Sequence, residues 1–213
     1  MSLTLRYMQL PDIQQVAAID KSCFQPPWSR DSYAFEIKES RVSHMVVLDR
    51  LEEPSLAPAR ARQNGWLVQL GEKLRGNSRS LNGRGNIIGY GGLWKIQGEA
   101  HVSTIATHPD YRGNGYGEIL LAGMFGKALR LNAEFIVLEV RVSNAVAQGL
   151  YQKYGFSRFG RRRNYYRNDN EDAWEMRVKL DRETRRQFMR LYDELLDRHE
   201  FRDAYSWKAR PRG

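Results

Sequence analysis

The chain has 213 residues, of which 41% are hydrophobic, and its single cysteine is Cys23. This length suits one well-buried domain with some surplus, and the lone cysteine excludes an internal disulfide or a cysteine-based zinc cluster. The sequence has neither a signal peptide pattern nor an apolar run that could span a bilayer, so we expect a cytoplasmic protein with no membrane contact.

The formal net charge is +9 and the isoelectric point is near 9.8, which makes the surface attractive to polyanions. The basic residues concentrate in residues 160–167 and in the last third of the chain. Nucleotide phosphates, RNA or an RNA-containing particle would suit this charge as partners. A basic face that only keeps the protein soluble explains the charge equally well.

Hydropathy patterns predict alternating helices and strands in the first half of the chain. They predict a strand over 3–8, a helix over 11–24, a second helix capped by Ser29, a strand over 43–49 and a hairpin of strands over 86–96 and 100–108. Residues 51–86 break this order, because they are rich in Pro, Arg, Gly, Asn and Ser. Ordinary connections have about 4–6 residues, so we expect a long inserted loop here, with residues 65–70 as its one candidate strand.

The second half alternates in the same way and ends in a clear amphipathic helix. The expected elements are a helix around 120–128, a strand over 135–142, a helix over 144–154, an antiparallel hairpin of 156–166 with 172–180, and the final helix over 181–200. We treat residues 1–180 as one domain and residues 181–213 as an appended helix and basic tail.

The stretch "HPDYRGNGYGEILL", residues 108–121, places a glycine-rich loop directly before a helix. Glycine allows close approach of a ligand, and a helix start offers free N–H groups with a partial positive charge, so the loop suits a phosphate. A Walker loop is excluded because no Lys and Ser or Thr follow Gly117. A dinucleotide fingerprint needs glycine where Glu118 stands, and a tight turn that binds nothing remains an alternative.

Glu139 interrupts a strand of Val, Leu and Ile, and Tyr151 faces inward from the helix that follows. A carboxylate among apolar residues is costly unless it is paired or used, and we expect burial to raise its pKa towards the range of a general base. The alternative is that Glu139 and Arg141 form a solvated pair on one face of the strand.

Three motifs in this order resemble the GNAT superfamily of acetyl-coenzyme A dependent N-acetyltransferases, and within it the RimI type. They are "IATHPDYRGNGYGEILL", "LEVRVSNAVAQGLYQKYGF" and "RRNYYRNDNEDAWEM". The resemblance covers residues 3–180 apart from the insertion. It implies an α/β (α+β) fold with a central mixed, mostly antiparallel sheet flanked by helices, to which the long inserted loop and the C-terminal helix are additions.

The resemblance also implies a set of site residues, with acetyl-coenzyme A as co-substrate. Glu139 matches the general base and Tyr151 the general acid, while His101 and His108 remain alternative bases. The matching coenzyme-binding positions are Ile105, Ala106, Thr107, Arg112, Gly113, Asn114, Gly115, Tyr116, Gly117, Glu118 and Asn144. Asn144 would serve equally well as a helix N-cap only.

The RimI type acetylates the N-terminal amine of a ribosomal protein, so the resemblance implies this acceptor and direct transfer in a ternary complex. The segments "PPWS" and "RRNYY" would line the acceptor side. Two other readings stay open, namely acetylation of a lysine side chain or small amine, and a non-catalytic module that binds acyl-coenzyme A or RNA.

Overall fold

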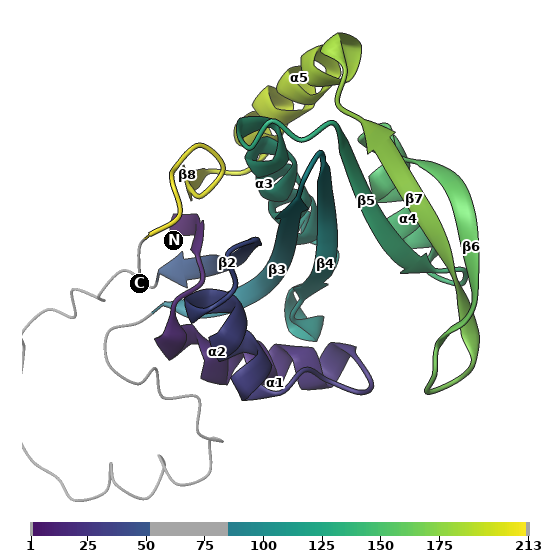
Figure 1. The fold of residues 1–213 in the computed structure, drawn as a ribbon. Helices are drawn as coiled ribbons and strands as arrows, with labels where there is room; N and C mark the ends of the chain where they lie inside the picture. The colour runs from purple at the N-terminus through teal and green to yellow at the C-terminus, as the bar shows by residue number, and fades with distance from the viewer. Residues whose placement is uncertain (1, 52–84, 212–213) are drawn as a thin grey trace, which may run out of the picture.

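The structure, a computed structural model, describes residues 2–51 and 85–211 (Figure 1). The expected inserted loop, with its candidate strand over 65–70, therefore lies almost entirely outside the described residues. None of the described helices is long and apolar enough to cross a bilayer.

The described residues form one eight-stranded sheet in the order β6-β7-β5-β4-β3-β2-β1-β8. Its strands are β1 (Ser2–Tyr7), β2 (Ser43–Leu51), β3 (Asn86–Ile96), β4 (Glu99–Thr107), β5 (Phe135–Arg141), β6 (Ser157–Tyr166), β7 (Glu171–Lys179) and β8 (Phe201–Ala204). Neighbouring strands are antiparallel except in the β4–β5 and β1–β8 pairs. The mixed, mostly antiparallel sheet expected from the resemblance is confirmed.

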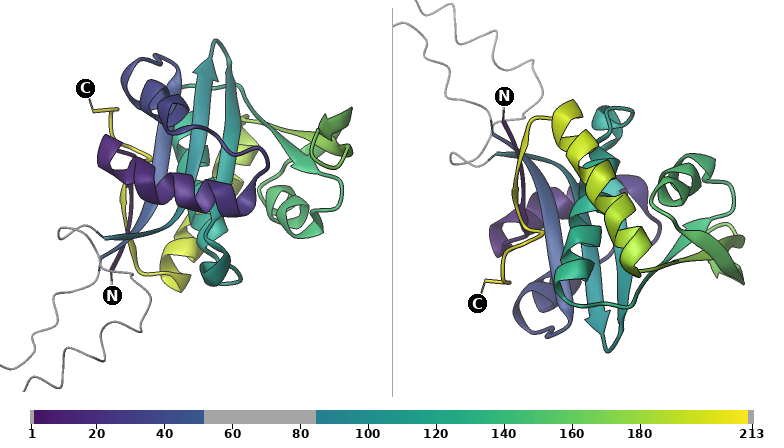
Figure 2. Two further views of the ribbon diagram at one scale, coloured as in Figure 1. Left: turned by 90° about the horizontal axis from the view of Figure 1, so that it is seen from below. Right: turned by 90° about the horizontal axis from the view of Figure 1, so that it is seen from above.

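Helices cover both faces of the sheet, as the two further views in Figure 2 show. They are α1 (Ile13–Cys23), α2 (Arg30–Lys38), α3 (Tyr116–Arg130), α4 (Ala145–Lys153) and α5 (Arg182–Arg198), with short 3-10 turns η1 (Leu10–Asp12) and η3 (Pro109–Tyr111). Alternate residues of β2 pack into the cores on the two faces of the sheet, because successive side chains of a strand point to opposite sides. Val46 and Leu48 join the core under α3, α4 and α5, whereas Met45 and Val47 join the core under α1 and α2.

Helix α3 packs closely on β3 because two glycines of "IIGYGG" leave room for it. A Cβ at Gly89 would lie 2.8 Å from Leu120 Cδ1, and a Cβ at Gly91 would lie 2.9 Å from Met124 Cε. Any larger residue at Gly89 would also meet the carbonyl oxygen of Ala106 at 2.9 Å. These glycines therefore set the distance between the sheet and the helix that begins at the glycine-rich loop.

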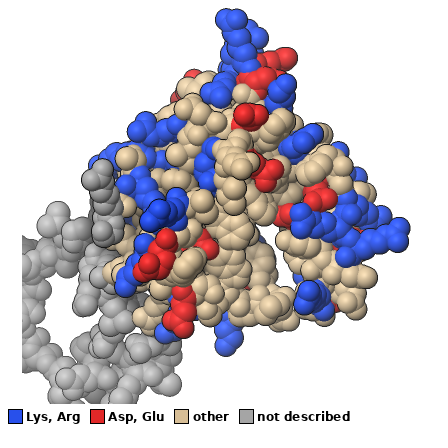
Figure 3. Space-filling view, in the orientation of Figure 1, with Lys and Arg blue, Asp and Glu red and all other residues tan. Residues whose placement is uncertain are grey.

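Strands β4 and β5 run side by side for only part of their length. Their pairing covers residues 99–101 against 135–137 and then stops. The register of β4 against β3 shifts at Ser103, where Val102 pairs with Leu93 but Thr104 pairs with Gly92, and such a bulge bends a strand. Figure 3 shows the surface notched between the part built on β3 and β4 and the part built on β6 and β7.

The C-terminal segment is built into the same structure. The expected amphipathic helix is confirmed as α5, and the ring of Phe188 stacks on that of Phe125 from α3 at 4.5 Å. Strand β8, which the sequence did not predict, pairs parallel to β1 at the edge of the sheet. Tyr205, directly after it, is fully buried in the core under α3.

Candidate active site

The glycine-rich loop presents a row of free backbone donors. Gly113 and Gly115 both have positive φ, 78° and 77°, and Gly115 is the N-cap of α3. No described residue accepts a hydrogen bond from the backbone N–H groups of residues 113–117. Five consecutive donors at the positive end of a helix dipole fit an anion, and they suit the diphosphate of coenzyme A.

Side chains of the loop hold it in place. Asn114 Nδ2 donates to the carbonyl oxygens of Tyr111 and Arg112, both at 3.1 Å. Arg112 Nε donates to the carbonyl oxygen of Thr107 at 3.3 Å, and its Nη2 lies 3.1 Å from Cys23 Sγ. The loop is thereby fastened to the end of β4.

Glu118 is buried and ties the first turn of α3 to two other helices. Its Oε1 accepts from Lys153 Nζ at 2.6 Å, Tyr154 Oη at 3.0 Å and Arg198 Nη2 at 3.0 Å. Burial raises the pKa of this carboxyl, but the bonds from its three partners outweigh that effect and the pKa is lowered overall. Its backbone N–H donates to the carbonyl oxygen of Gly115. Both the side chain and the N–H of Glu118 are therefore already engaged.

Residues 105–107 lie where β4 has lost its partner on one side. Ile105, Ala106 and Thr107 pair with β3 along one edge of the strand. Along the other edge β5 no longer follows, because its pairing with β4 ends at His101. This stretch leads directly from the opening between the strands to the glycine-rich loop.

Glu139 of β5 and His101 of β4 meet where the two strands part. Glu139 Oε2 lies 2.7 Å from His101 Nε2, and its Oε1 lies 3.2 Å from Arg162 Nη2 on β6. The carboxylate is largely buried, with 10% of the side chain exposed, whereas 26% of His101 is exposed. A carboxylate paired with a partly exposed imidazole can accept a proton, and each group fixes the orientation of the other.

The expected rise in the pKa of Glu139 is wrong. Burial does raise it, but the hydrogen bond and charge of His101 and the charge of Arg162 outweigh burial, and the pKa is lowered overall. The alternative pairing with Arg141 is not formed either, because Arg141 binds Asp169 and Glu171 at 2.7 and 2.6 Å.

Tyr151 lies on α4 and is 5% exposed, as its inward-facing position in the sequence predicts. Burial raises the pKa of its hydroxyl well above the usual range, so it stays protonated. No described residue bonds to this hydroxyl, which leaves it available to a bound molecule. Tyr151 belongs to the core under α3, together with Leu138 and Val140, whereas Glu139 alternates with them and lies on the opposite face of β5.

The two remaining candidates have local structural roles. Asn144 caps α4, and its Oδ1 accepts from the N–H of Ala147 at 3.1 Å. His108 Nδ1 accepts from the N–H of Asp110 at 3.2 Å and caps η3. His108 is therefore not brought to Glu139, whereas His101 is.

An aromatic pocket of about 400 Å³ lies beside the Glu139–His101 pair. Its lining residues are Trp28, Ser32, Phe35, Glu36 and Trp94. The indole rings of Trp28 and Trp94 stack at 6.2 Å, and Trp94 Nε1 donates to Glu36 Oε2 at 2.9 Å. Trp94 also meets the His101 ring edge-on at 5.7 Å, so the pocket adjoins the pair.

Comparison with known proteins decides the family. The pattern of the acetyltransferase (GNAT) family matches residues 13–156. A Bacillus subtilis (strain 168) protein named as a candidate ribosomal protein bS18-alanine N-acetyltransferase is 32% identical over 177 residues, which are 83% of this chain and 95% of that protein. The chain belongs to the GNAT family of acetyltransferases. It is therefore an acetyltransferase, and acetyl-coenzyme A is its acetyl donor.

Two further comparisons, one of sequence and one of structure, agree with this family and fold. The ribosomal protein bS18-alanine N-acetyltransferase of Escherichia coli K12 is 35% identical over 95 residues, 44% of this chain and 64% of that protein. The crystal structure of the Escherichia coli ribosomal-protein-S18-alanine N-acetyltransferase superposes with a TM-score of 0.61 at 24% identity, over 84% of this chain and 94% of that one.

Sequence reasoning missed several residues of this site. The pocket residues Glu36 and Trp94 were not singled out, and His101 was not paired with Glu139. Arg162 was expected only as part of the acceptor-side segment "RRNYY", not as a partner of Glu139. The parallel register that brings β4 to β5 is a tertiary contact without a local sequence signal. The one usable signal was an aromatic and a histidine on the two strands of a predicted hairpin, where Trp94 pairs with His101.

Proposed function

We propose that this enzyme acetylates the N-terminal α-amine of a ribosomal protein in the cytoplasm. The names of the Bacillus subtilis and Escherichia coli relatives, which refer to ribosomal protein bS18-alanine, support this acceptor. The net charge of +9 supports work close to ribosomal RNA. In this proposal residues 1–180 carry the acetyltransferase and residues 181–213 are an extension that stabilises it.

The position of Glu139 and His101, at the level where β4 and β5 separate, carries the chemical part of the proposal. A protonated amine cannot attack, so Glu139, acting with His101, removes a proton from the ammonium group. The amine nitrogen then bonds to the carbonyl carbon of the thioester and the C–S bond breaks. Tyr151, on the other side of the opening, donates its hydroxyl proton to the departing sulfur. The amide nitrogen releases its second proton to water and Tyr151 regains a proton from water, so the products are a neutral amide and a thiol.

The free N–H groups of residues 113–117 would hold the diphosphate of acetyl-coenzyme A. Ile105, Ala106 and Thr107 would lie along the pantetheine arm, because they connect this loop with the opening between the strands. Arg112 and Asn114 would act by fixing the loop, Asn144 would contact the coenzyme from the start of α4, and Glu118 would anchor the first turn of α3.

The aromatic pocket would receive the first residues of the acceptor. Trp28 and Trp94 offer flat apolar surfaces, and Glu36 adds a carboxylate at their edge, a combination that suits a short peptide with a cationic end. Because Trp94 also touches His101, a peptide in this pocket places its amine next to the proposed base.

A purified-enzyme assay with matched acceptors tests the proposal. A peptide with the N-terminal sequence of ribosomal protein bS18 should gain one acetyl group at its α-amine, as located by fragmentation mass spectrometry. The control is the same peptide with a blocked N-terminus and an internal lysine, and spermidine serves as a small amine. Acetylation of the blocked peptide or of spermidine in preference to the free peptide would overturn the acceptor assignment.

A further inference from the structure

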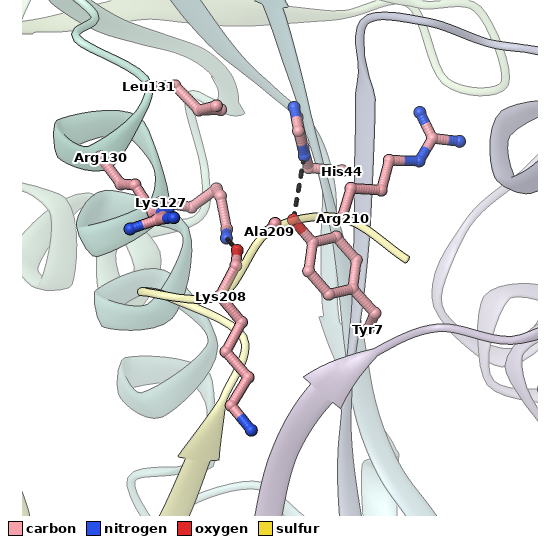
Figure 4. A pocket seen from close by; sticks show the side chains of 8 residues that line it. All are labelled: Tyr7, His44, Lys127, Arg130, Leu131, Lys208, Ala209 and Arg210. Carbon is pink, nitrogen blue, oxygen red and sulfur yellow. Dashed lines mark hydrogen bonds between the residues drawn. The ribbon is translucent and has the colours of Figure 1, made fainter. Parts of the chain in front are cut away.

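A second cavity lies at the far end of α3 from the glycine-rich loop. It has a volume of about 460 Å³, and small-ligand sites usually have about 300–1,000 Å³. Its lining residues are Tyr7, His44, Lys127, Arg130, Leu131, Lys208, Ala209 and Arg210 (Figure 4). The run from Tyr116 to Arg130 spans about 20 Å of helix, so this cavity is separate from the proposed coenzyme site.

The lining is strongly cationic and contains no carboxylate. Lys127 and Arg130 line it from α3, and Lys208 and Arg210 line it from the segment after β8. Arg130 and Lys208 are exposed, and no described carboxylate forms an ion pair with either of them.

The carbonyl groups that usually offset cations at helix ends are already bonded. Backbone N–H groups of residues 131–133 donate to the last carbonyl oxygens of α3. Arg210 donates to the carbonyl oxygens of Glu36, Ile37 and Ser40 at the end of α2, which fixes its charge at the cavity wall. These carbonyl groups at the two helix ends therefore already have donors within the protein.

Lys127 is the buried member of this set, with 1% of the residue exposed. Its ammonium lies 4.9 Å from the ring centroid of Tyr7 and 4.8 Å from that of Tyr205, and it donates to the carbonyl oxygen of Lys208 at 2.5 Å. These neutral partners orient the charge without neutralising it. Asp203 acts on it only from a distance and is itself bonded to Tyr192, Tyr205 and Ser206.

The positive charges around the cavity contribute to the lowered pKa values of two of its residues. Burial and the charge of Arg130 lower the pKa of Lys127 to about 8, although Asp203 opposes this. Burial and the charges of Lys127 and Arg210 lower the pKa of His44 to about 4. An anion in the cavity would relieve this mutual repulsion.

We propose that this cavity binds a phosphate-bearing anion, either a free phosphorylated metabolite or a phosphate of RNA. Lys127 and Arg130 belong to one wall of the cavity, and Lys208 and Arg210 belong to the other. The Tyr7 hydroxyl, held at 3.2 Å by His44 Nδ1, supplies a neutral polar group between them. The proposal does not depend on the identity of the acetyl acceptor.

Calorimetry with tripolyphosphate tests the site, in the presence of saturating coenzyme A so that the glycine-rich loop is filled. The double variant Arg130→Gln/Lys208→Gln removes two exposed charges that have no described ion-pair partner, and its affinity should fall at least about tenfold. The matched control is Arg186→Gln/Arg190→Gln on α5, which removes the same charge from two exposed positions and should change affinity less than about twofold.

A single-stranded RNA of about ten nucleotides distinguishes the two sources of phosphate. If RNA competes with tripolyphosphate and depends on Arg130 and Lys208, the site serves RNA. If tripolyphosphate binds and RNA does not compete, the site serves a free phosphorylated ligand. Absence of tripolyphosphate binding, or equal binding by the double variant and its control, would overturn the proposal.

Discussion

His101 Nε2 lies 2.7 Å from Glu139 Oε2, and the two residues belong to strands that stop pairing at this level. The contact keeps the Glu139 carboxylate ionised, since its pKa is lowered despite burial. A carboxylate whose pKa is lowered is a weak base alone, and the imidazole of His101 is the partner that can carry the proton. The two side chains are therefore expected to work as one unit.

A double-mutant cycle tests this expectation. Glu139→Gln and His101→Gln should each lower kcat by about 10²–10⁴-fold, the usual contribution of general base catalysis, with coenzyme affinity unchanged. If the pair is one unit, the double variant should be no slower than the slower single variant. Two independent losses that multiply in the double variant would contradict the coupling.

Tyr151→Phe removes the proposed proton donor without changing the shape of α4. We expect kcat to fall about 10²-fold with little change in coenzyme affinity. Tyr154→Phe, at the C-cap of the same helix, is the matched control, because it removes another buried hydroxyl, the one bonded to Glu118. The control should lose about 1 kcal/mol of stability and keep its turnover. Equal turnover in Tyr151→Phe and the wild type would exclude Tyr151 as the acid.

Gly117→Ala should weaken acetyl-coenzyme A binding at least about tenfold while the protein folds normally. A Cβ at Gly117 meets only Thr107 Oγ1, at 3.6 Å, so the methyl group fits in the folded protein. It would, however, take up space beside the free N–H groups that the diphosphate needs. Gly149→Ala on α4 is the control, since a Cβ there contacts nothing within 4 Å. Gly115 is unsuitable for this test because a Cβ would lie 2.6 Å from His199 Nε2. Calorimetry that finds equal affinity in the two variants would place the diphosphate elsewhere.

Phe188→Ala should lower the free energy of unfolding by about 3–5 kcal/mol, the usual cost of removing a fully buried aromatic ring. Phe188 is 1% exposed and stacks on Phe125, which joins α5 to α3. Its neighbour Met189 is 44% exposed, so Met189→Ala should change stability by less than about 0.5 kcal/mol. Urea denaturation of both variants provides the measurement. A small loss in Phe188→Ala would mean that α5 is only loosely attached.

His44 makes the folded protein sensitive to acid. Its pKa is lowered to about 4, below the value of about 6.5 expected in the unfolded chain. Between these values the unfolded chain binds the proton and the folded protein does not, so stability falls as pH falls through this window, by at most about 3 kcal/mol. Urea denaturation from pH 7 to pH 4 should show a shallower decline in His44→Gln than in the wild type or in His108→Gln, a half-exposed control. Parallel declines in all three would assign the sensitivity to other groups.

The sequence was sufficient for elements whose signals are local. Ser29 was expected to cap a helix, and its hydroxyl does accept from the N–H of Ser32. The helix expected over 144–154 does end just before Gly155, which has a positive φ of 84°. The amphipathic pattern over 181–200 predicted a buried helix face in the same way, and Phe188 lies on that face. In each case one residue or one repeat decides the structure.

Features that depend on distant contacts were not predictable. Strand β8 has four residues, and it forms a strand only because β1 offers a free edge. The pKa of Glu139 depends on His101, which is 38 residues away along the chain, so burial alone gave the wrong direction. The cationic cavity likewise joins residues that are far apart in the sequence, from Tyr7 to Arg210.

Arg198 binds Glu118 across 80 residues of chain, and the neighbouring His199 lies against Gly115. The contacts that hold the glycine-rich loop and the first turn of α3 thus include a segment about 80 residues further along the chain. Contacts of such long range form late in folding, because a large loop of chain must close before they stabilise anything. In a refolding experiment, the sheet and α3 should acquire their secondary structure first, and the capacity to bind coenzyme should return only in the last kinetic phase.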